Sequence, residues 1–131
     1  MKIYLAVPLR ASRNLDFARL LHGAIRESGH ETVSDYVVCD DYDQGLLPSQ
    51  IFERDIAALL SSDCIIADIS SPSTGVGMEL GFAHINSKKI LLLASKGSEP
   101  SRLPAGIPGA SIIEYASEQE AAAKLKVALE N

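Results

Sequence analysis

Five short apolar runs alternate along the chain with segments that repeat apolar residues at helical spacing, and this alternation restricts the fold more than any other feature. The runs cover residues 2–7, 31–38, 64–69, 89–94 and 110–115. Strands that alternate with helices form parallel sheets with right-handed crossovers and helices on both faces. We therefore predict an α/β fold over residues 1–131 as a single domain. It is a flavodoxin-like or Rossmann-like three-layer sandwich, with a five-stranded parallel sheet in the order 2-1-3-4-5.

The helical segments are indicated by their apolar stripes and end signals. The first carries Ser12 or Asn14 as its N-cap and ends at Gly29. A second opens at Pro48 and runs to about Leu60, and the last covers residues 118–130. The second places its apolar residues on one continuous arc: Ile51, Phe52, Ile56, Leu59 and Leu60.

Asp55 falls inside that apolar arc. A carboxylate on a stripe that faces the core must be paired, protonated or open to a cavity. Its neighbours Glu53 and Arg54 point elsewhere on the helical wheel, and we interpret them as ordinary solvated charges. The misplaced Asp55 is therefore a candidate functional carboxylate.

A polar loop rich in Ser, Pro, Thr and Gly follows the third run, and a helix that carries Glu79 follows the loop. Such a turn can bring backbone N–H groups and hydroxyls to one point, which suits an anion. We expect Glu79 in the first turn of the helix, where a carboxylate also favours the helix dipole. A capping role is the ordinary interpretation of such a glutamate, but the dense polar loop beside it favours an active-site carboxylate.

The predicted topology brings this loop to a second one. In the order 2-1-3-4-5 the switch point lies between strands one and three, and ligands bind beyond the carboxyl ends of these strands. Residues 8–10 follow the first strand and residues 70–79 follow the third. We therefore expect both loops to line one crevice.

Composition excludes several classes of function. The net charge of −5 leaves no basic face for coating nucleic acid. No apolar run is long enough to span a membrane, and Met1-Lys2 leads straight into a strand without a signal peptide. Cys39 and Cys64 lie far apart, which makes a disulfide improbable and predicts a cytoplasmic protein.

Other motifs are weak, so we expect no cofactor and no metal. The glycines 75, 77 and 81 match a dinucleotide fingerprint poorly. Asp41-x-Asp43-x-Gly45 resembles the start of a calcium loop, but Phe52 stands where the bidentate glutamate belongs. The histidines show no metal-ligand spacing. Two carboxylates beside a hydroxyl-rich loop instead suit glycosyl chemistry, which needs one carboxylate at the anomeric carbon and another for protons or orientation.

These residues resemble the nucleoside 2-deoxyribosyltransferase superfamily, and most closely its 2'-deoxynucleoside 5'-phosphate N-hydrolase branch. The resemblance covers residues 2–115. It is carried by Tyr4, the loop through Arg10, Phe52-Glu53-Arg54-Asp55, Ala67-Asp68, and above all Ser71-Pro72-Ser73-Thr74-Gly75-Val76-Gly77-Met78-Glu79-Leu80-Gly81.

The resemblance implies a role for each matching residue. Glu79 matches the catalytic glutamate that attacks the anomeric carbon, Asp55 the acid that assists at sugar and base, and Tyr4 an active-site tyrosine. The substrate-binding residues it implies are Pro8, Leu9, Arg10, Tyr36, Asp68, Ser73, Gly75 and Gly77. The family forms homodimers or larger homo-oligomers whose subunits complete each other's sites, here near residues 102–109.

Two prolines depart from the hydrolase pattern. Pro8 and Pro104 stand where that branch has serines, so phosphate binding would rest on Ser73, Arg10 and backbone amides. The expected function is hydrolysis of the N-glycosidic bond of 2'-deoxynucleoside 5'-monophosphates. The alternatives are exchange of bases on deoxynucleosides, or a non-catalytic nucleotide-binding module. The retained carboxylates count against a module of that kind, because a binder of anions gains nothing from acids nearby.

Overall fold

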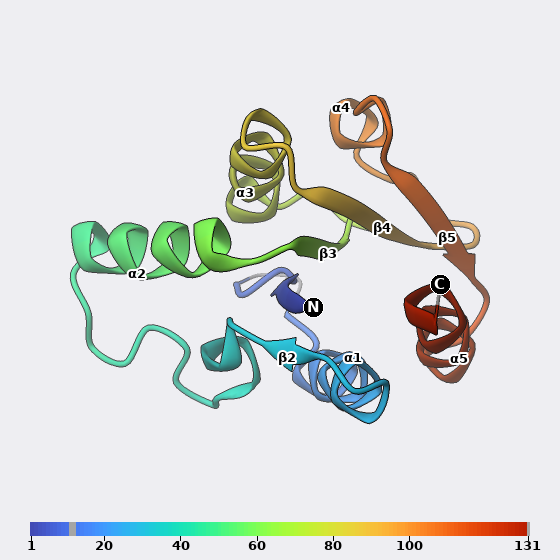
Figure 1. Cartoon of the computed structure of the whole chain (residues 1–131), viewed down its shortest axis with the longest axis horizontal. Coiled ribbons are helices and arrows are strands. Elements are labelled where there is room, and N and C mark those ends of the chain that lie inside the picture. The colour runs from blue at the N-terminus through green and yellow to red at the C-terminus, as the bar shows by residue number, and fades with distance from the viewer. Residues whose placement is uncertain (11–12, 131) are drawn as a thin grey trace.

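A computed structural model of the chain describes residues 1–10 and 13–130. Five strands form one parallel sheet in the order β2-β1-β3-β4-β5, which confirms the predicted topology (Figure 1). The strands are β1 (Lys2–Ala6), β2 (Glu31–Thr32), β3 (Cys64–Asp68), β4 (Lys89–Ser95) and β5 (Ser111–Tyr115).

Helices cover both faces of this sheet. The helices α1 (Leu15–Glu27) and α5 (Glu118–Glu130) pack together on one face. The helices α2 (Pro48–Ser61) and α3 (Thr74–Ile85) cover the other face, as Figure 1 shows. A short helix, α4 (Arg102–Ala105), lies in the connection before β5. Among the described residues, none of the helices combines the length and the apolar character needed to cross a membrane.

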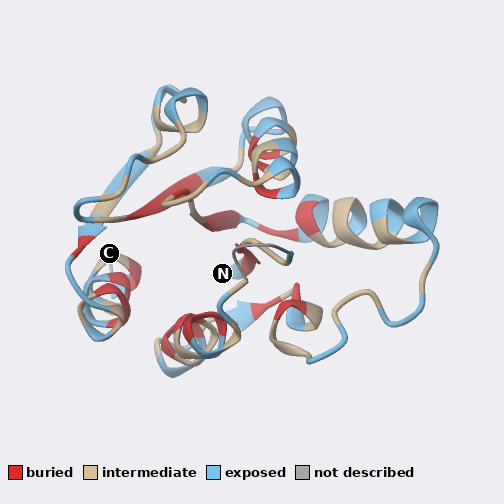
Figure 2. Cartoon of the chain, turned by 180° about the vertical axis from the view of Figure 1, so that it is seen from behind, coloured by how far each residue is buried: buried red, intermediate tan, exposed pale blue. Residues whose placement is uncertain are grey.

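The central strands divide the core into two apolar clusters. Along β1, Ile3 and Leu5 join the cluster under α1 and α5, whereas Tyr4 and Ala6 join the cluster under α2 and α3. Successive side chains of a strand point to opposite faces, so a strand covered on both sides is apolar throughout. Figure 2 shows this burial along β3 and β4. Burial on both faces explains why the central strands were recognisable as apolar runs in the sequence.

The ends of α1 follow the predicted signals. The side chain of Asn14 caps the helix by accepting a hydrogen bond from the Phe17 backbone N–H at 3.0 Å. Gly29 follows the helix with a φ of +84°, which a residue with a side chain rarely adopts. The alternative cap, Ser12, lies outside the described residues.

The second strand is shorter than predicted. It ends at Thr32, and Asp35–Val38 forms a 3-10 helix (η1) instead of extending the strand to residue 38. The cause is Ser34, whose hydroxyl accepts from the Leu5 N–H at 2.9 Å and donates to the Leu5 carbonyl at 3.0 Å. A side chain thus replaces the next step of the backbone ladder, and the chain turns away.

The predicted core-facing arc of α2 is also partly wrong. Leu59 is buried, but Ile51 and Ile56 are only half-buried, and Phe52 and Leu60 each keep 45% of their surface exposed. Ile51, Phe52 and Ile56 lie in the part of α2 that lines a cavity instead of covering the sheet. On α5, Val127 likewise lies outside the core and is 60% exposed.

Ser34→Ala should lower the free energy of unfolding by about 2–3 kcal/mol, because it leaves the buried N–H and C=O of Leu5 without their partner. Urea denaturation followed by circular dichroism measures this. Ser61→Ala, at an exposed position, serves as the control and should change stability by less than about 0.5 kcal/mol. Equal losses for the two variants would contradict this account of the β2 end.

Candidate active site

A cavity of about 540 Å³ opens at the carboxyl ends of β1 and β3. Its walls come from the loop after β1, from Tyr42, from the first half of α2, and from the start of α3 with the loop before it. The two loops that the predicted topology assigned to one crevice therefore meet here. Of the residues singled out in the sequence, the cavity brings together Pro8, Leu9, Arg10, Asp55, Ser73, Gly75 and Glu79.

Glu79 lies in the second turn of α3, not in the first as predicted. Ser73 is the N-cap, and no acidic residue occupies the first turn. Glu79 is therefore not a dipole-capping residue. It reaches the floor of the cavity, where burial raises the pKa of its carboxyl to about 7. A hydrogen bond from Tyr4 and the charge of Arg54 lower that pKa, whereas the charge of Asp55 raises it.

Two tyrosines, Tyr4 and Tyr36, form a chain of hydrogen bonds that ends on the Glu79 carboxylate. Tyr4, on β1, is 1% exposed, and its hydroxyl donates a hydrogen bond to Oε2 of Glu79. The hydroxyl of Tyr36, on η1, donates in turn to the Tyr4 hydroxyl at 2.9 Å. Burial and the nearby Glu79 charge raise the pKa of Tyr4 far above its ordinary value, so that it stays a proton donor. Tyr4 and Tyr36 thus orient Glu79 without lining the cavity themselves.

Asp55 is paired, and its partner corrects our interpretation of Arg54. The Arg54 Nε donates to Asp55 Oδ1 at 2.9 Å, and both side chains are mostly buried, with 19% and 17% of their surface exposed. The guanidinium of Arg54 also lies 3.7 Å from the centre of the Tyr36 ring. Neighbouring residues of a helix do not normally face each other, so sequence spacing carried no signal of this contact.

Residues 73–76, at the start of α3, line the cavity. The hydroxyl of Ser73 accepts from the Val76 N–H at 3.3 Å, as a helix cap does. The first N–H groups of a helix have no acceptor within the helix, and they attract anions. A side chain at Gly75 would meet no protein atom within 4 Å, so this glycine leaves open space in the cavity wall. The exposed Arg10 lines the same cavity.

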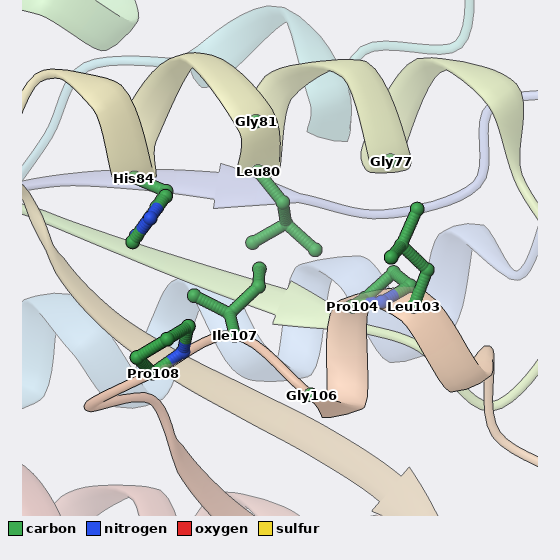
Figure 3. A pocket seen from close by; sticks show the side chains of 9 residues that line it. All are labelled: Gly77, Leu80, Gly81, His84, Leu103, Pro104, Gly106, Ile107 and Pro108. Atoms are coloured by element: carbon green, nitrogen blue, oxygen red, sulfur yellow. The ribbon is translucent and has the colours of Figure 1, made fainter.

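Besides Tyr4 and Tyr36, which contact Glu79 from outside the cavity, Asp68 and Gly77 of the expected set also do not line it. Asp68 Oδ1 accepts from the backbone N–H and the hydroxyl of Ser70, at 3.0 and 2.7 Å, and Tyr115 donates to Oδ2 at 3.4 Å. Asp68 therefore ties the end of β3 to β5 and does not line the cavity. Gly77 faces a second hollow, between α3 and α4 (Figure 3). On the helix, Gly75 and Gly77 point to different sides.

Within residues 1–10 and 13–130, no three His, Cys, Asp or Glu side chains are grouped so that they could hold a metal ion. Glu79, whose pKa is raised to about 7, is partly ionised near neutral pH and accepts a hydrogen bond from the buried Tyr4. This arrangement suits a nucleophile or a group that stabilises developing positive charge.

Glu79→Gln should stabilise the fold at pH 8 by roughly 2–3 kcal/mol, because folding no longer has to bury a charged carboxylate. The folded-state pKa of Glu79 lies above its ordinary value of 4.5, so the native protein holds a proton that the unfolded chain releases between pH 4.5 and 7. The wild type therefore loses this stability as pH rises through that window. Urea denaturation of both proteins should give curves that converge below pH 4.5. A constant difference would contradict a raised pKa.

The chain matches the family described as nucleoside 2-deoxyribosyltransferase over residues 3–124. A protein of Thermofilum pendens, provisionally named 2'-deoxynucleoside 5'-phosphate N-hydrolase 1, is 37% identical over 97 residues, which are 72% of this chain and 68% of that protein. The 5-hydroxymethyl-dUMP N-hydrolase of Tetraodon nigroviridis is 35% identical over 117 residues, or 84% of this chain and 80% of that protein.

Solved structures agree with these sequence matches. The CMP N-glycosidase BcmB of Clostridium botulinum superposes with a TM-score of 0.72 at 25% identity, covering 95% of this chain and 98% of that one. A 2-deoxyribosyltransferase of Bacillus psychrosaccharolyticus, at 17% identity and a TM-score of 0.69, covers 93% and 90% and shares the fold. By its sequence match over residues 3–124 and by these relatives, the chain belongs to the nucleoside 2-deoxyribosyltransferase family of enzymes.

Proposed function

We propose that the protein hydrolyses the N-glycosidic bond of 2'-deoxynucleoside 5'-monophosphates and releases the free base and 2-deoxyribose 5-phosphate. The observation that carries the proposal is the arrangement of one cavity. Glu79, supported by Tyr4, and Asp55 share it with Arg10 and the N-terminus of α3. Carboxylates and an anion-binding end thus occupy the same space, as a deoxynucleotide requires. The names of the N-hydrolase relatives support the same substrate class.

Glu79 would act as the nucleophile. Its carboxylate attacks the anomeric carbon, the C–N bond breaks, and the electron pair leaves with the base. The departing base takes up a proton, and the water that later opens the glycosyl ester releases one. Asp55 is placed to transfer these protons or to orient the sugar. Arg54 Nε donates to its Oδ1, and this hydrogen bond orients the Asp55 carboxylate.

The phosphate would lie at the other end of the cavity. Arg10 supplies positive charge, and the N–H groups at the start of α3 supply donors. Pro8 also lines the cavity and offers neither a hydroxyl nor an N–H. Specificity for the phosphate would therefore depend strongly on Arg10. If Arg10 does not serve this purpose, exchange of bases on unphosphorylated deoxynucleosides becomes the better description of the same site.

Deoxynucleoside monophosphates should be cleaved with a higher kcat/KM than the matching nucleosides, and Arg10→Ala should remove most of that preference while changing nucleoside cleavage little. The assay follows release of free base from each deoxynucleotide and deoxynucleoside, with and without an added acceptor base. Folded Glu79→Gln serves as the inactive control and should lose several orders of magnitude in rate. Equal or better cleavage of nucleosides, or faster capture of the sugar by the added base than by water, would establish the transferase alternative.

We also propose that the protein acts in the cytoplasm, where deoxynucleotides occur and Cys39 and Cys64 stay reduced.

We further propose that the protein forms a homodimer or larger homo-oligomer. The support is a mostly apolar hollow of about 370 Å³ between α3 and the segment 103–108, shown in Figure 3. Leu103, on its rim, is 89% exposed. Residues 102–109 are also the segment expected to complete the site of a neighbouring subunit.

Leu103→Asp should shift the protein from an oligomer to a monomer in light scattering, because a charge cannot be buried in an apolar interface. The matched control is Val127→Asp, which adds the same charge to an exposed apolar position of α5. Cleavage activity should fall together with the loss of the oligomer. A wild-type protein that is monomeric at assay concentrations would refute this proposal.

A further inference from the structure

We infer that Arg54 is a positioning residue: it orients the carboxylate of Asp55 and, stacked on Tyr36, supports the tyrosine pair that ends on Glu79. The inference deepens the proposed function and rests on it for its kinetic consequences. It concerns a residue that the helical wheel indicated to be an ordinary solvated charge.

Three contacts from three segments fix the Arg54 guanidinium. Its Nε donates to Asp55 Oδ1 at 2.9 Å, and its Nη1 donates to the Tyr42 carbonyl oxygen at 2.8 Å. Its plane lies over the Tyr36 ring, 3.7 Å from the ring centre. Asp55 and Tyr42 line the cavity, and Tyr36 leads through Tyr4 to Glu79. Arg54 therefore contacts two residues of the cavity wall, Asp55 and Tyr42. It also contacts Tyr36, which leads through Tyr4 to Glu79.

The contact between Arg54 and Asp55 is not a by-product of helix geometry. Successive helical residues project in directions about 100° apart, so adjacent side chains must bend toward each other to meet. The contact with the Tyr36 ring and the hydrogen bond to the Tyr42 carbonyl hold the Arg54 side chain in this bent conformation. Among the described residues, the buried Arg54 Nη2 has no hydrogen-bond partner, and this lowers stability.

The charge of Arg54 acts on a cluster that is otherwise acidic. Asp55 and Glu79 face it from α2 and α3, and Tyr36 faces it from η1. In the loop before α2, the pKa of Asp43 is lowered chiefly by the Gly45 N–H and by Asp41, with smaller effects of Arg54 and Arg10. Two carboxylates in one cavity disfavour each other's ionisation. The charge of Arg54, fixed beside them, lowers the pKa of Glu79 and so opposes the effect of Asp55 on it.

The sign of the effect on Glu79 follows from this charge. Burial and the Asp55 charge raise the pKa of Glu79, whereas the Tyr4 hydrogen bond and Arg54 lower it. Removing the positive charge should therefore raise that pKa further and move the acidic limb of the kcat/KM profile to higher pH. Lysine at this position would keep the charge. It would lose the planar fork and the stacked face that orient Asp55.

The test compares Arg54→Gln and Arg54→Lys with the wild type. Carbon-13 NMR of the Glu79 carboxyl, assigned with Glu79→Gln, should show its titration midpoint raised by about one pH unit in Arg54→Gln. In Arg54→Lys the midpoint should stay near that of the wild type, while kcat falls more than KM rises. The control is Arg26→Gln, which removes the same charge from the exposed end of α1 and should change neither quantity.

A double-mutant cycle tests the route through Asp55. In an Asp55→Asn background, Arg54→Gln should lower kcat much less than in the wild type, because the carboxylate it orients is gone. If the losses of kcat in Arg54→Gln and Asp55→Asn simply add in the double variant, Arg54 does not act through Asp55. An unchanged Glu79 midpoint in folded Arg54→Gln would overturn the electrostatic part. If Arg54→Gln does not fold, a folded Arg54→Lys with normal kcat would overturn the inference.

The two kinds of failure can be told apart. The NMR titration needs no turnover, so it decides on Arg54 even in a protein that cleaves no substrate. Absence of cleavage in the wild type would refute the proposed function alone. Normal cleavage by the wild type, with an unchanged midpoint in Arg54→Gln and additive losses in the double-mutant cycle, would refute the role of Arg54 alone.

Discussion

The hydrogen bond from Tyr4 to Glu79 joins the hydrophobic core to the cavity, and much of the site depends on it. Tyr4 is a buried residue in the middle of β1, so its position is set by the pairing of β1 with β3. Glu79 takes its place from α3 but its orientation from that strand. Burial raises its pKa to about 7, and the tyrosine limits this rise. A carboxylate with a pKa of about 7 is thus held by a buried residue of a central strand.

The site also uses residues that stability alone would place differently. The first half of α2 directs Ile51, Phe52 and Ile56 toward the cavity instead of toward the sheet, and Phe52 remains 45% exposed. The helix α3 contains three glycines, although glycine weakens a helix, and none of the three is required by a neighbouring protein atom. These departures from close packing line the two hollows on either side of α3. They lie where the sequence pattern and the burial pattern disagree.

The parts of the fold that could be predicted are those whose signal is local. Strands buried on both faces are continuous apolar runs, so β1, β3 and β4 and the strand order were recognisable. Asp55 was singled out because it falls inside an apolar arc, and Glu79 because a dense polar loop lies beside it. The shortening of β2 was missed, because it depends on a Ser34 side chain that reaches a residue 29 positions earlier. The second-turn position of Glu79 was missed because the sequence did not show which serine caps α3.

Residue order alone established the alternation of strands and helices, the carboxyl-end location of the two loops, and the candidate carboxylates Asp55 and Glu79. The groups that surround these carboxylates depend on contacts between segments that are distant in the chain. Arg54 meets Asp55 because Tyr36 and the Tyr42 carbonyl, 18 and 12 positions earlier, hold its guanidinium. Asp68 lies outside the cavity, where Ser70 and, from another strand, Tyr115 donate hydrogen bonds to its carboxylate. The physical reason is the same in both cases: charge and hydrogen bonding act between atoms that are close in space, and the helical or strand period describes only neighbours along the chain.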